Sequence, residues 1–196
     1  MSTLIDFRSL IIPHVPGCPD FLIEDAVRKA ARAYCKDTWV WQDGPDENEP
    51  LAADPLEAQT VYQLTNEDDA SIIAISNVIK NETPMKPGIE YAKAVKDSKI
   101  IFSGPLNATD VVEVKRVHRP SATATALPDF LLEDHAEGIA NKAIAELLKM
   151  AGKPWTDAAK AMYHEGLYLA AVQDANAAAL KGGTNASLTA YPRDFG

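Results

Sequence analysis

The sequence predicts an α+β protein, in which an N-terminal helix and a C-terminal antiparallel helix hairpin form a helical bundle and an antiparallel β meander is inserted between them. Residues of about 19–41 and 127–181 carry apolar side chains at the three- and four-residue spacing of helices. Residues of about 58–118 carry short β-branched and aromatic runs bounded by turn formers. At 196 residues, the chain is expected to form a single domain, 1–196.

The first predicted helix follows Pro13, Pro16 and Pro19, whose spacing predicts an extended chain before it. Asp20 is the expected N-cap, and basic residues follow toward the other end, where the helix dipole favours cations. The helix is expected to end around residues 39–41. Its apolar face is made of Ile23, Val27, Ala30, Ala31 and Tyr34.

Short β-branched and aromatic runs make up the middle of the chain. The strand candidates are Val61–Leu64, Ile72–Ile79, Ile89–Val95, Lys99–Phe102 and Val111–Val117. Asp97-Ser98 looks like a hairpin turn and Gly104-Pro105 like the start of a loop, while the acidic, proline-rich stretch 43–55 reads as a solvated loop. Pro120 should end the sheet, because proline cannot donate to a strand ladder.

Two further helices are predicted at the C-terminal end. Pro128 and Asp129 open the second helix, which should run to Gly152, and Thr156 is the expected cap of the third, which runs to about Lys181. The short connection predicts an antiparallel hairpin. The third helix is rich in alanine, so its C-terminal half is either solvated or packed against another subunit. The tail, 182–196, ends in aromatic residues that can become ordered on a partner.

Charge and composition exclude several functions. Lys and Arg number 19 against 28 Asp and Glu, which gives a net charge of -9 and argues against a protein that grips DNA. DNA could still pass along its surface. No apolar run approaches the roughly 20 residues of a membrane-spanning helix, and no secretion signal is evident. Cys18 and Cys35 are therefore expected to be free thiols that serve in packing.

No catalytic constellation is visible, so no catalytic residue, metal ligand or cofactor is assigned. The histidines are scattered, and the acidic segment 43–49 lacks the residues of a calcium loop. No glycine-rich phosphate loop opens a helix. The tryptophans are expected to close a core rather than line a ligand pocket. The histidines are His14, His118, His135 and His164, and the tryptophans are Trp39, Trp41 and Trp155.

The layout of helix, strands, helix hairpin and tail resembles the head-to-tail adaptor (connector) proteins of tailed bacteriophages, including the tail-tubular adaptor of short-tailed phages. The resemblance lies in Ile12-Pro13-His14-Val15-Pro16-Gly17-Cys18-Pro19 leading into Leu22–Trp41. It continues in Leu127-Pro128-Asp129-Phe130, which opens the helix pair, and in Gly152-Lys153-Pro154-Trp155 between the two helices. It covers most of the chain, but the strand region matches in layout more than in residues.

The resemblance implies a homo-oligomeric ring, commonly a dodecamer, in the neck of the virion. Such a ring docks beneath the portal, joins the capsid to the tail or its nozzle, and continues the channel through which DNA is ejected, without binding DNA specifically. The protein would be made in the cytoplasm of the bacterial host. The portal-binding candidates are Tyr191, Pro192, Arg193, Asp194 and Phe195, and the ring-packing candidates are Ala170, Ala171, Ala175, Ala178 and Ala179.

Two alternatives remain open at this stage. The same composition suits another neck or tail ring protein, such as a stopper or a tail-completion protein. An α+β enzyme would require a pocket in which polar groups with shifted pKa values converge.

Overall fold

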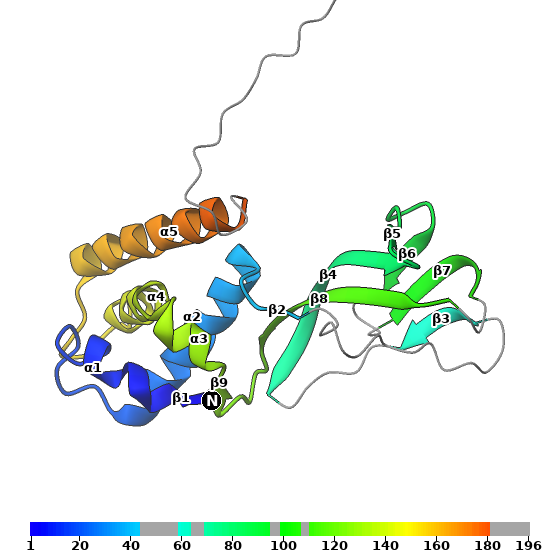
Figure 1. The fold of residues 1–196 in the computed structure, drawn as a ribbon. Helices are drawn as coiled ribbons and strands as arrows, with labels where there is room; N and C mark the ends of the chain where they lie inside the picture. Colours follow the sequence, from blue (N-terminus) through cyan, green and yellow to red (C-terminus); the bar gives the residue numbers. More distant parts are fainter. Residues whose placement is uncertain (44–58, 64–68, 95–98, 107–109, 181–196) are drawn as a thin grey trace, which may run out of the picture.

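A computed structural model describes residues 1–43, 59–63, 69–94, 99–106 and 110–180. The chain contains helices and antiparallel strands, so it is an α+β protein as the sequence predicts. In Figure 1 the helices gather in one part of the molecule and the longer strands extend from it in another. The N-terminus lies in the helical part, next to β9.

The helical part is built from both ends of the described chain. Its elements are η1 (Leu4–Phe7), α1 (Arg8–Ile11), α2 (Asp20–Thr38), α3 (Asp129–Glu133), α4 (Ala136–Leu148) and α5 (Ala158–Leu180). The two-residue strands β1 (Ser2–Thr3) and β9 (Ala126–Leu127) pair with each other beside these helices. The amino group of Met1 lies 2.7 Å from the carboxylate of Asp129, which ties the N-terminus to the start of α3.

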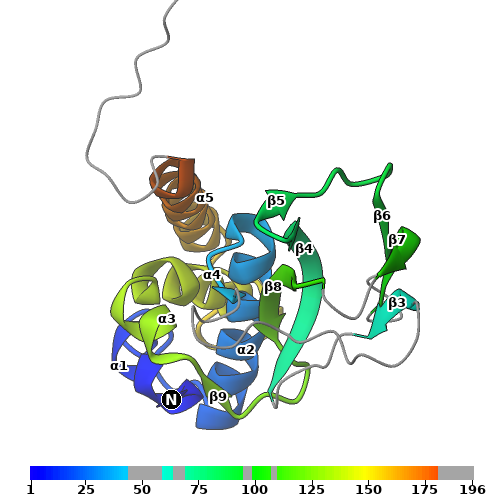
Figure 2. The ribbon, with the colours of Figure 1, turned by 45° about the vertical axis from the view of Figure 1, so that its right-hand side comes forward.

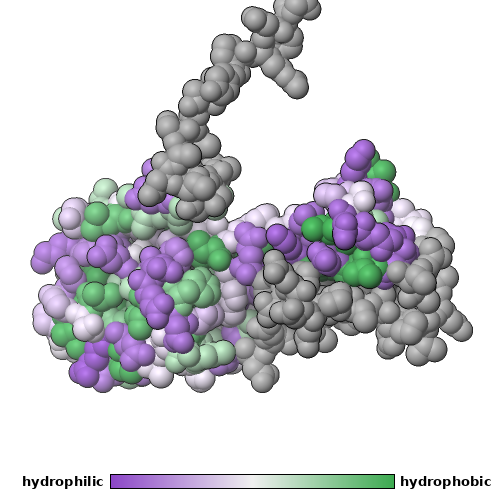
Figure 3. Space-filling model, viewed as in Figure 1, coloured by the Kyte–Doolittle hydropathy of each residue, from purple (hydrophilic) through white to green (hydrophobic). Residues whose placement is uncertain are grey.

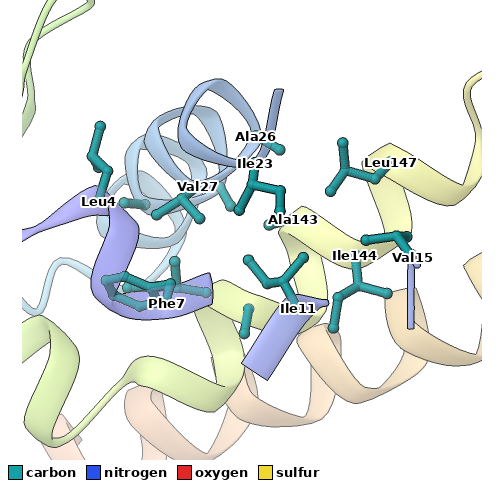
Figure 4. Close-up of a cluster of buried hydrophobic side chains, with 14 of the residues drawn as sticks. Leu4, Phe7, Ile11, Val15, Ile23, Ala26, Val27, Ala143, Ile144 and Leu147 are labelled. Atoms are coloured by element: carbon teal, nitrogen blue, oxygen red, sulfur yellow. The ribbon is translucent and has the colours of Figure 1, made fainter. Parts of the chain in front are cut away.

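A continuous hydrophobic core holds the helical part together. Figure 4 shows side chains from η1, α1, α2 and α4 pointing toward one another. Phe7, Ile11, Ile23, Val27 and Leu147 are fully buried there. Burying side chains of this size stabilises the fold by about 1.5–3 kcal/mol each.

The segment before α2 is not the extended chain that its prolines predict. Residues 4–11 are helical, and backbone hydrogen bonds from His14 to Ile11, from Val15 to Ile12 and from Cys18 to Val15 make successive turns. The prolines are compatible with this path because each occupies a position where no backbone donor is needed. Val15 and Cys18 consequently reach the core.

Helix boundaries differ from the expected ones in three places. Asp20 is the first residue of α2 rather than its cap, and its carboxylate pairs with Arg8 Nε at 3.0 Å. The predicted second helix is divided into α3 and α4 at Asp134 and His135. Asp157, not Thr156, caps α5, because its Oδ1 accepts a hydrogen bond from the Lys160 amide at 3.0 Å.

The strands form two larger antiparallel sheets. Their members are β2 (Gln42–Asp43), β3 (Gln59–Gln63), β4 (Ala70–Lys80), β5 (Thr83–Pro84), β6 (Tyr91–Ala94), β7 (Lys99–Leu106) and β8 (Val112–Pro120). One sheet has the order β2-β8-β4-β5 and the other has β3-β7-β6. This is not the pairing order of a simple meander, because β8 returns to lie beside β4. The β6–β7 hairpin does form, with Ala94 opposite Lys99; its expected turn, 97–98, lies outside the described residues.

A second, smaller core lies between these sheets. It joins Ile75 and Val78 of β4 to Tyr91 of β6, Ile100 of β7 and Val114 of β8. In Figure 2 the β4–β8 pair lies next to α2, and β3, β6 and β7 lie on its far side. The strands therefore bury one another, and β8 also packs against α2.

Bulges explain two departures from simple strand patterns. The register of β4 against β8 shifts twice, between Ile72 and Ala74 and between Ile75 and Asn77. Each shift adds one residue to β4, so its buried residues Ile72, Ile75 and Val78 are spaced three apart rather than two. Gly104-Pro105 lies inside β7 rather than in a loop, opposite the irregular end of β3 where no ladder donor is required.

Candidate functional site

The first half of α5 presents apolar side chains outward. Met162, Tyr163 and Leu169 are 76%, 64% and 53% exposed, respectively. Gly166 lies between them, and a Cβ added there would meet nothing within 4 Å. Hydrophobic side chains reach the surface along α5 in Figure 3. We call Met162, Tyr163, Gly166, Leu169 and Ala170 the outer face of α5.

Helical periodicity explains why these side chains point outward. The opposite side of α5 carries Ala161, His164 and Tyr168, which are buried, and continues with Ala171 and Ala175, which pack against the helical core. Residues three and four apart share one helix face, so burying that side turns the outer face toward solvent. Alanine-rich sequence alone does not distinguish the two sides.

Polar contacts fix the orientation of α5. Tyr168 donates a hydrogen bond to Asp37 Oδ2 at 2.6 Å, joining α5 to the end of α2. Glu165 accepts from Lys142 at 2.7 Å and from Lys149 at 2.9 Å, joining it to α4 and the residue that follows α4. The ammonium of Lys142 also lies 5.0 Å from the centre of the Tyr168 ring. The outer face is consequently presented by a firmly attached helix.

A histidine pair lies beside the outer face. The rings of His14 and His164 meet edge-on with centroids 4.6 Å apart, and the ring of Tyr163 lies 5.4 Å from that of His164. His164 Nδ1 is 2.8 Å from Asn141 Oδ1. Burial, with a smaller contribution from His14, lowers the pKa of His164. His164 is therefore neutral at pH 7 and packs as an uncharged ring.

A concavity of about 460 Å³ lies where α2, α4 and α5 meet. The Tyr34 hydroxyl is 3.1 Å from His135 Nδ1 in its wall. Burial raises the pKa of Tyr34 to about 12 and lowers that of His135, so both groups are neutral at pH 7. Four acidic residues also line the concavity: Glu133, Asp134, Glu137 and Asp174.

A shallower groove of about 440 Å³ lies at the ends of α2 and α5. Trp39 lines it and is held in the left-handed backbone region at φ 54° as the residue that ends α2. Ala179, close to the end of the described part of α5, lines it as well. Trp155 is buried in the helical core and Trp41 packs against it partly buried, as expected, whereas Trp39 is 45% exposed and does not close the core.

The remaining candidate residues are placed as follows. Ala171 and Ala175 pack inward against the core of their own chain, whereas Ala170, Ala178 and Ala179 are exposed. The tail candidates, 191–195, lie outside the described residues. Cys18 and Cys35 are free, buried thiols, and burial raises the pKa of Cys35 to about 12.

Within the described residues, no three metal-binding side chains gather at one point. In the same residues, no helix is long and apolar enough to cross a membrane.

The outer face of α5 cannot be recognised from the sequence because Met162, Tyr163 and Leu169 are separated by small or polar residues. The alanine-rich sequence carries no signal that separates them from the buried side of the helix. The sequence matches no family model, and no curated protein is similar to it.

Proposed function

We propose that the protein is a head-to-tail adaptor of a tailed bacteriophage, a structural virion protein that forms a ring beneath the portal. The observation that carries the proposal is the outer face of α5, where Met162, Tyr163 and Leu169 are exposed on a helix held firmly to its own subunit. Exposed apolar groups gathered on one rigid element favour a protein contact. The resemblance in sequence layout supports the same role.

In this role the helices act as a bundle that builds the wall of the ring, and the strands form an inserted β part that faces the tail or its nozzle. A ring of identical copies needs two different surfaces on each copy that fit each other. We assign one of them to the outer face of α5, together with Ala170, Ala178 and Ala179. Ala171 and Ala175 instead support α5 from within.

The proposal places the protein in the neck of the virion after synthesis in the bacterial host. Its partners are further copies of itself, commonly twelve in such rings, the portal protein, and a tail protein. Residues 191–195 reach the portal. Double-stranded DNA passes through the channel, and the net charge of -9 disfavours extended binding to it.

The test is the mass of the assembled particle, measured by native mass spectrometry and sedimentation, for the protein alone and mixed with the portal of the same virus. We expect a complex of many copies. Leu169→Glu should prevent assembly because it places a charge in the contact. Ile89→Glu is the matched control, since Ile89 is 70% exposed but lies in the β part. A monomer indifferent to the portal would contradict the proposal.

The same measurement separates this role from that of a stopper or a tail-completion protein. Those proteins would also form rings through the outer face, but their assembly would not depend on the portal. Assembly triggered by another neck or tail protein, with no response to the portal, would assign the chain to one of these roles instead.

A further inference from the structure

Arginine side chains from two elements meet where α2 passes the end of β8. Arg28 Nε donates to the carbonyl of Ala124 at 2.8 Å, and Arg32 Nη1 donates to the carbonyl of Pro120 at 3.1 Å. Arg119 comes immediately before Pro120 on β8. The hydrogen bond to Pro120 therefore holds Arg32 beside the residue that follows Arg119, and burial, followed by the positive charge of Arg119, lowers the pKa of Arg32.

Within the part of the chain that the structure describes, few carboxylates compensate these positive charges. Arg28 Nη1 lies 3.5 Å from Asp25, but the other oxygen of that carboxylate already pairs with Lys29 at 2.7 Å. Among the described residues, neither Arg32 nor Arg119 forms an ion pair. The nearby carboxylate of Asp69 instead accepts hydrogen bonds from the amide and hydroxyl of Thr125. Charged side chains that are partly buried are usually paired, so this pair of arginines calls for an explanation.

A hydrogen bond positions Arg32, and both guanidinium groups retain donors that have no partner among the described residues. The carbonyl of Pro120 accepts a hydrogen bond from Nη1 of Arg32, and the other N–H groups of that guanidinium remain available as donors. Arg119 Nε is fully shielded from solvent and has no hydrogen-bond partner among the described residues. Both side chains are half-buried, so a small ligand can still reach them. Lys36, one helical turn beyond Arg32, is exposed and adds positive charge on the same side of α2.

We propose that Arg32 and Arg119 bind a phosphate group between α2 and the end of β8. A guanidinium fork matches two phosphate oxygens, and two such forks can engage three or four oxygens of a tetrahedral anion. A carboxylate offers only two oxygens and a single charge. The site itself does not depend on ring formation. That the phosphate belongs to the DNA backbone rests on the proposed function, and such a contact would be local in an otherwise acidic protein.

The test uses the full chain and follows the arginine Nε–H signals in ¹H–¹⁵N spectra. Inorganic phosphate is titrated first, with sodium chloride at matched ionic strength as the control for screening. A short duplex DNA of mixed sequence is titrated second. We expect saturable shifts of the Arg32 and Arg119 signals with phosphate and not with chloride.

Variants then assign the site. Arg32→Gln and Arg119→Gln should each weaken phosphate binding about tenfold or more, as expected for the loss of a charge-assisted contact. Arg8→Gln removes the same charge from an exposed ion pair with Asp20, and it should change the affinity for phosphate less than twofold. Arg32→Lys and Arg119→Lys keep the charge but lose the fork, so they provide a second series if a glutamine variant fails to fold.

The outcomes separate the site from its source of phosphate. Shifts with both ligands, with DNA binding weakened by salt and displaced by phosphate, identify the DNA backbone as the ligand. Shifts with phosphate alone keep the site but remove DNA as its ligand, whether or not rings assemble. No saturable shift of the Arg32 or Arg119 signals with phosphate would overturn the inference, and so would an Arg32→Gln variant that binds as tightly as the unmodified protein.

Discussion

Tyr168 of α5 donates its hydroxyl hydrogen to Asp37 Oδ2 at 2.6 Å, across a sequence separation of 131 residues. The contact fastens the last described helix to the end of α2. Burial and the neighbouring carboxylate raise the pKa of Tyr168, so the hydroxyl remains a donor at every physiological pH. The stability that this hydrogen bond contributes therefore measures how firmly α5, with its outer face, is held to α2.

Tyr168→Phe should lower the free energy of unfolding by about 1–2 kcal/mol, because it removes a hydrogen bond to a charged acceptor while keeping the ring. Urea unfolding followed by circular dichroism measures the change. Tyr163→Phe is the matched control, since Tyr163 is on the same helix but exposed, and it should change stability by less than about 0.5 kcal/mol. Equal effects of the two substitutions would show that the Asp37 contact contributes nothing.

Two helical glycines should respond in opposite directions to alanine. At Gly138 of α4 an added Cβ would lie 2.8 Å from Tyr34 Cε2 and 3.1 Å from Ala171 Cβ. Gly138→Ala should therefore destabilise the protein by about 1–3 kcal/mol despite the better helix propensity of alanine. Gly166→Ala should stabilise it by up to about 1 kcal/mol, because its surroundings are open. Thermal unfolding of both variants checks the pair, and a stabilising Gly138→Ala would refute the close packing of α2, α4 and α5.

The two thiols should report different depths of burial. Cys35 is fully buried and burial raises its pKa to about 12, whereas the pKa of Cys18, near the surface of the core, is raised by burial and by Asp20. We expect neither to react with a thiol reagent in the folded protein at pH 7, and Cys18 to react first as denaturant is added. Mass spectrometry of alkylated Cys18→Ser and Cys35→Ala variants separates the two rates. Rapid modification of Cys35 without denaturant would contradict the position of α2 in the core.

Much of the helical part can be predicted from the sequence, because its apolar residues follow helical spacing over long segments. Ile23 and Val27 are recognisable as core residues on that basis, and both are fully buried. At the start of the chain, Leu4, Phe7, Ile11 and Val15 are also spaced at three or four residues, but the prolines predict an extended segment before α2. Proline removes single backbone donors and does not by itself prevent a segment from forming turns.

The strand pairing could not be predicted in the same way. Alternation of side chains indicates a strand but does not name its neighbour, and the return of β8 to β4 depends on contacts far apart in the sequence. The outer face of α5 and the Arg32–Arg119 pair depend on such contacts too. In the sequence, Arg119 belongs to a short basic stretch, 115–119, and no local signal places it next to α2.

The buried histidines should make stability depend on pH near neutrality. Burial lowers the pKa of both His135 and His164 in the folded protein, and the charge of His14 adds to the effect at His164. The unfolded chain, with ordinary histidine pKa values of about 6.5, therefore binds more protons than the folded chain below that pH. The stabilising effect of the neutral rings is fully present above about pH 6.5 and is lost as the pH falls through the folded pKa values.

We consequently expect the free energy of unfolding to decrease from pH 7.5 to pH 5.5, a range chosen to avoid the titration of carboxylates. His164→Gln should reduce that decrease, and the double variant with His135→Gln should reduce it further, even where each variant is less stable at pH 7.5. Urea unfolding at each pH gives the slopes, which are compared rather than the absolute stabilities. A stability that is flat or rises toward pH 5.5 in the unmodified protein would show that the two rings are not held neutral, and the packing of α5 against α4 at His164 would then have to be different.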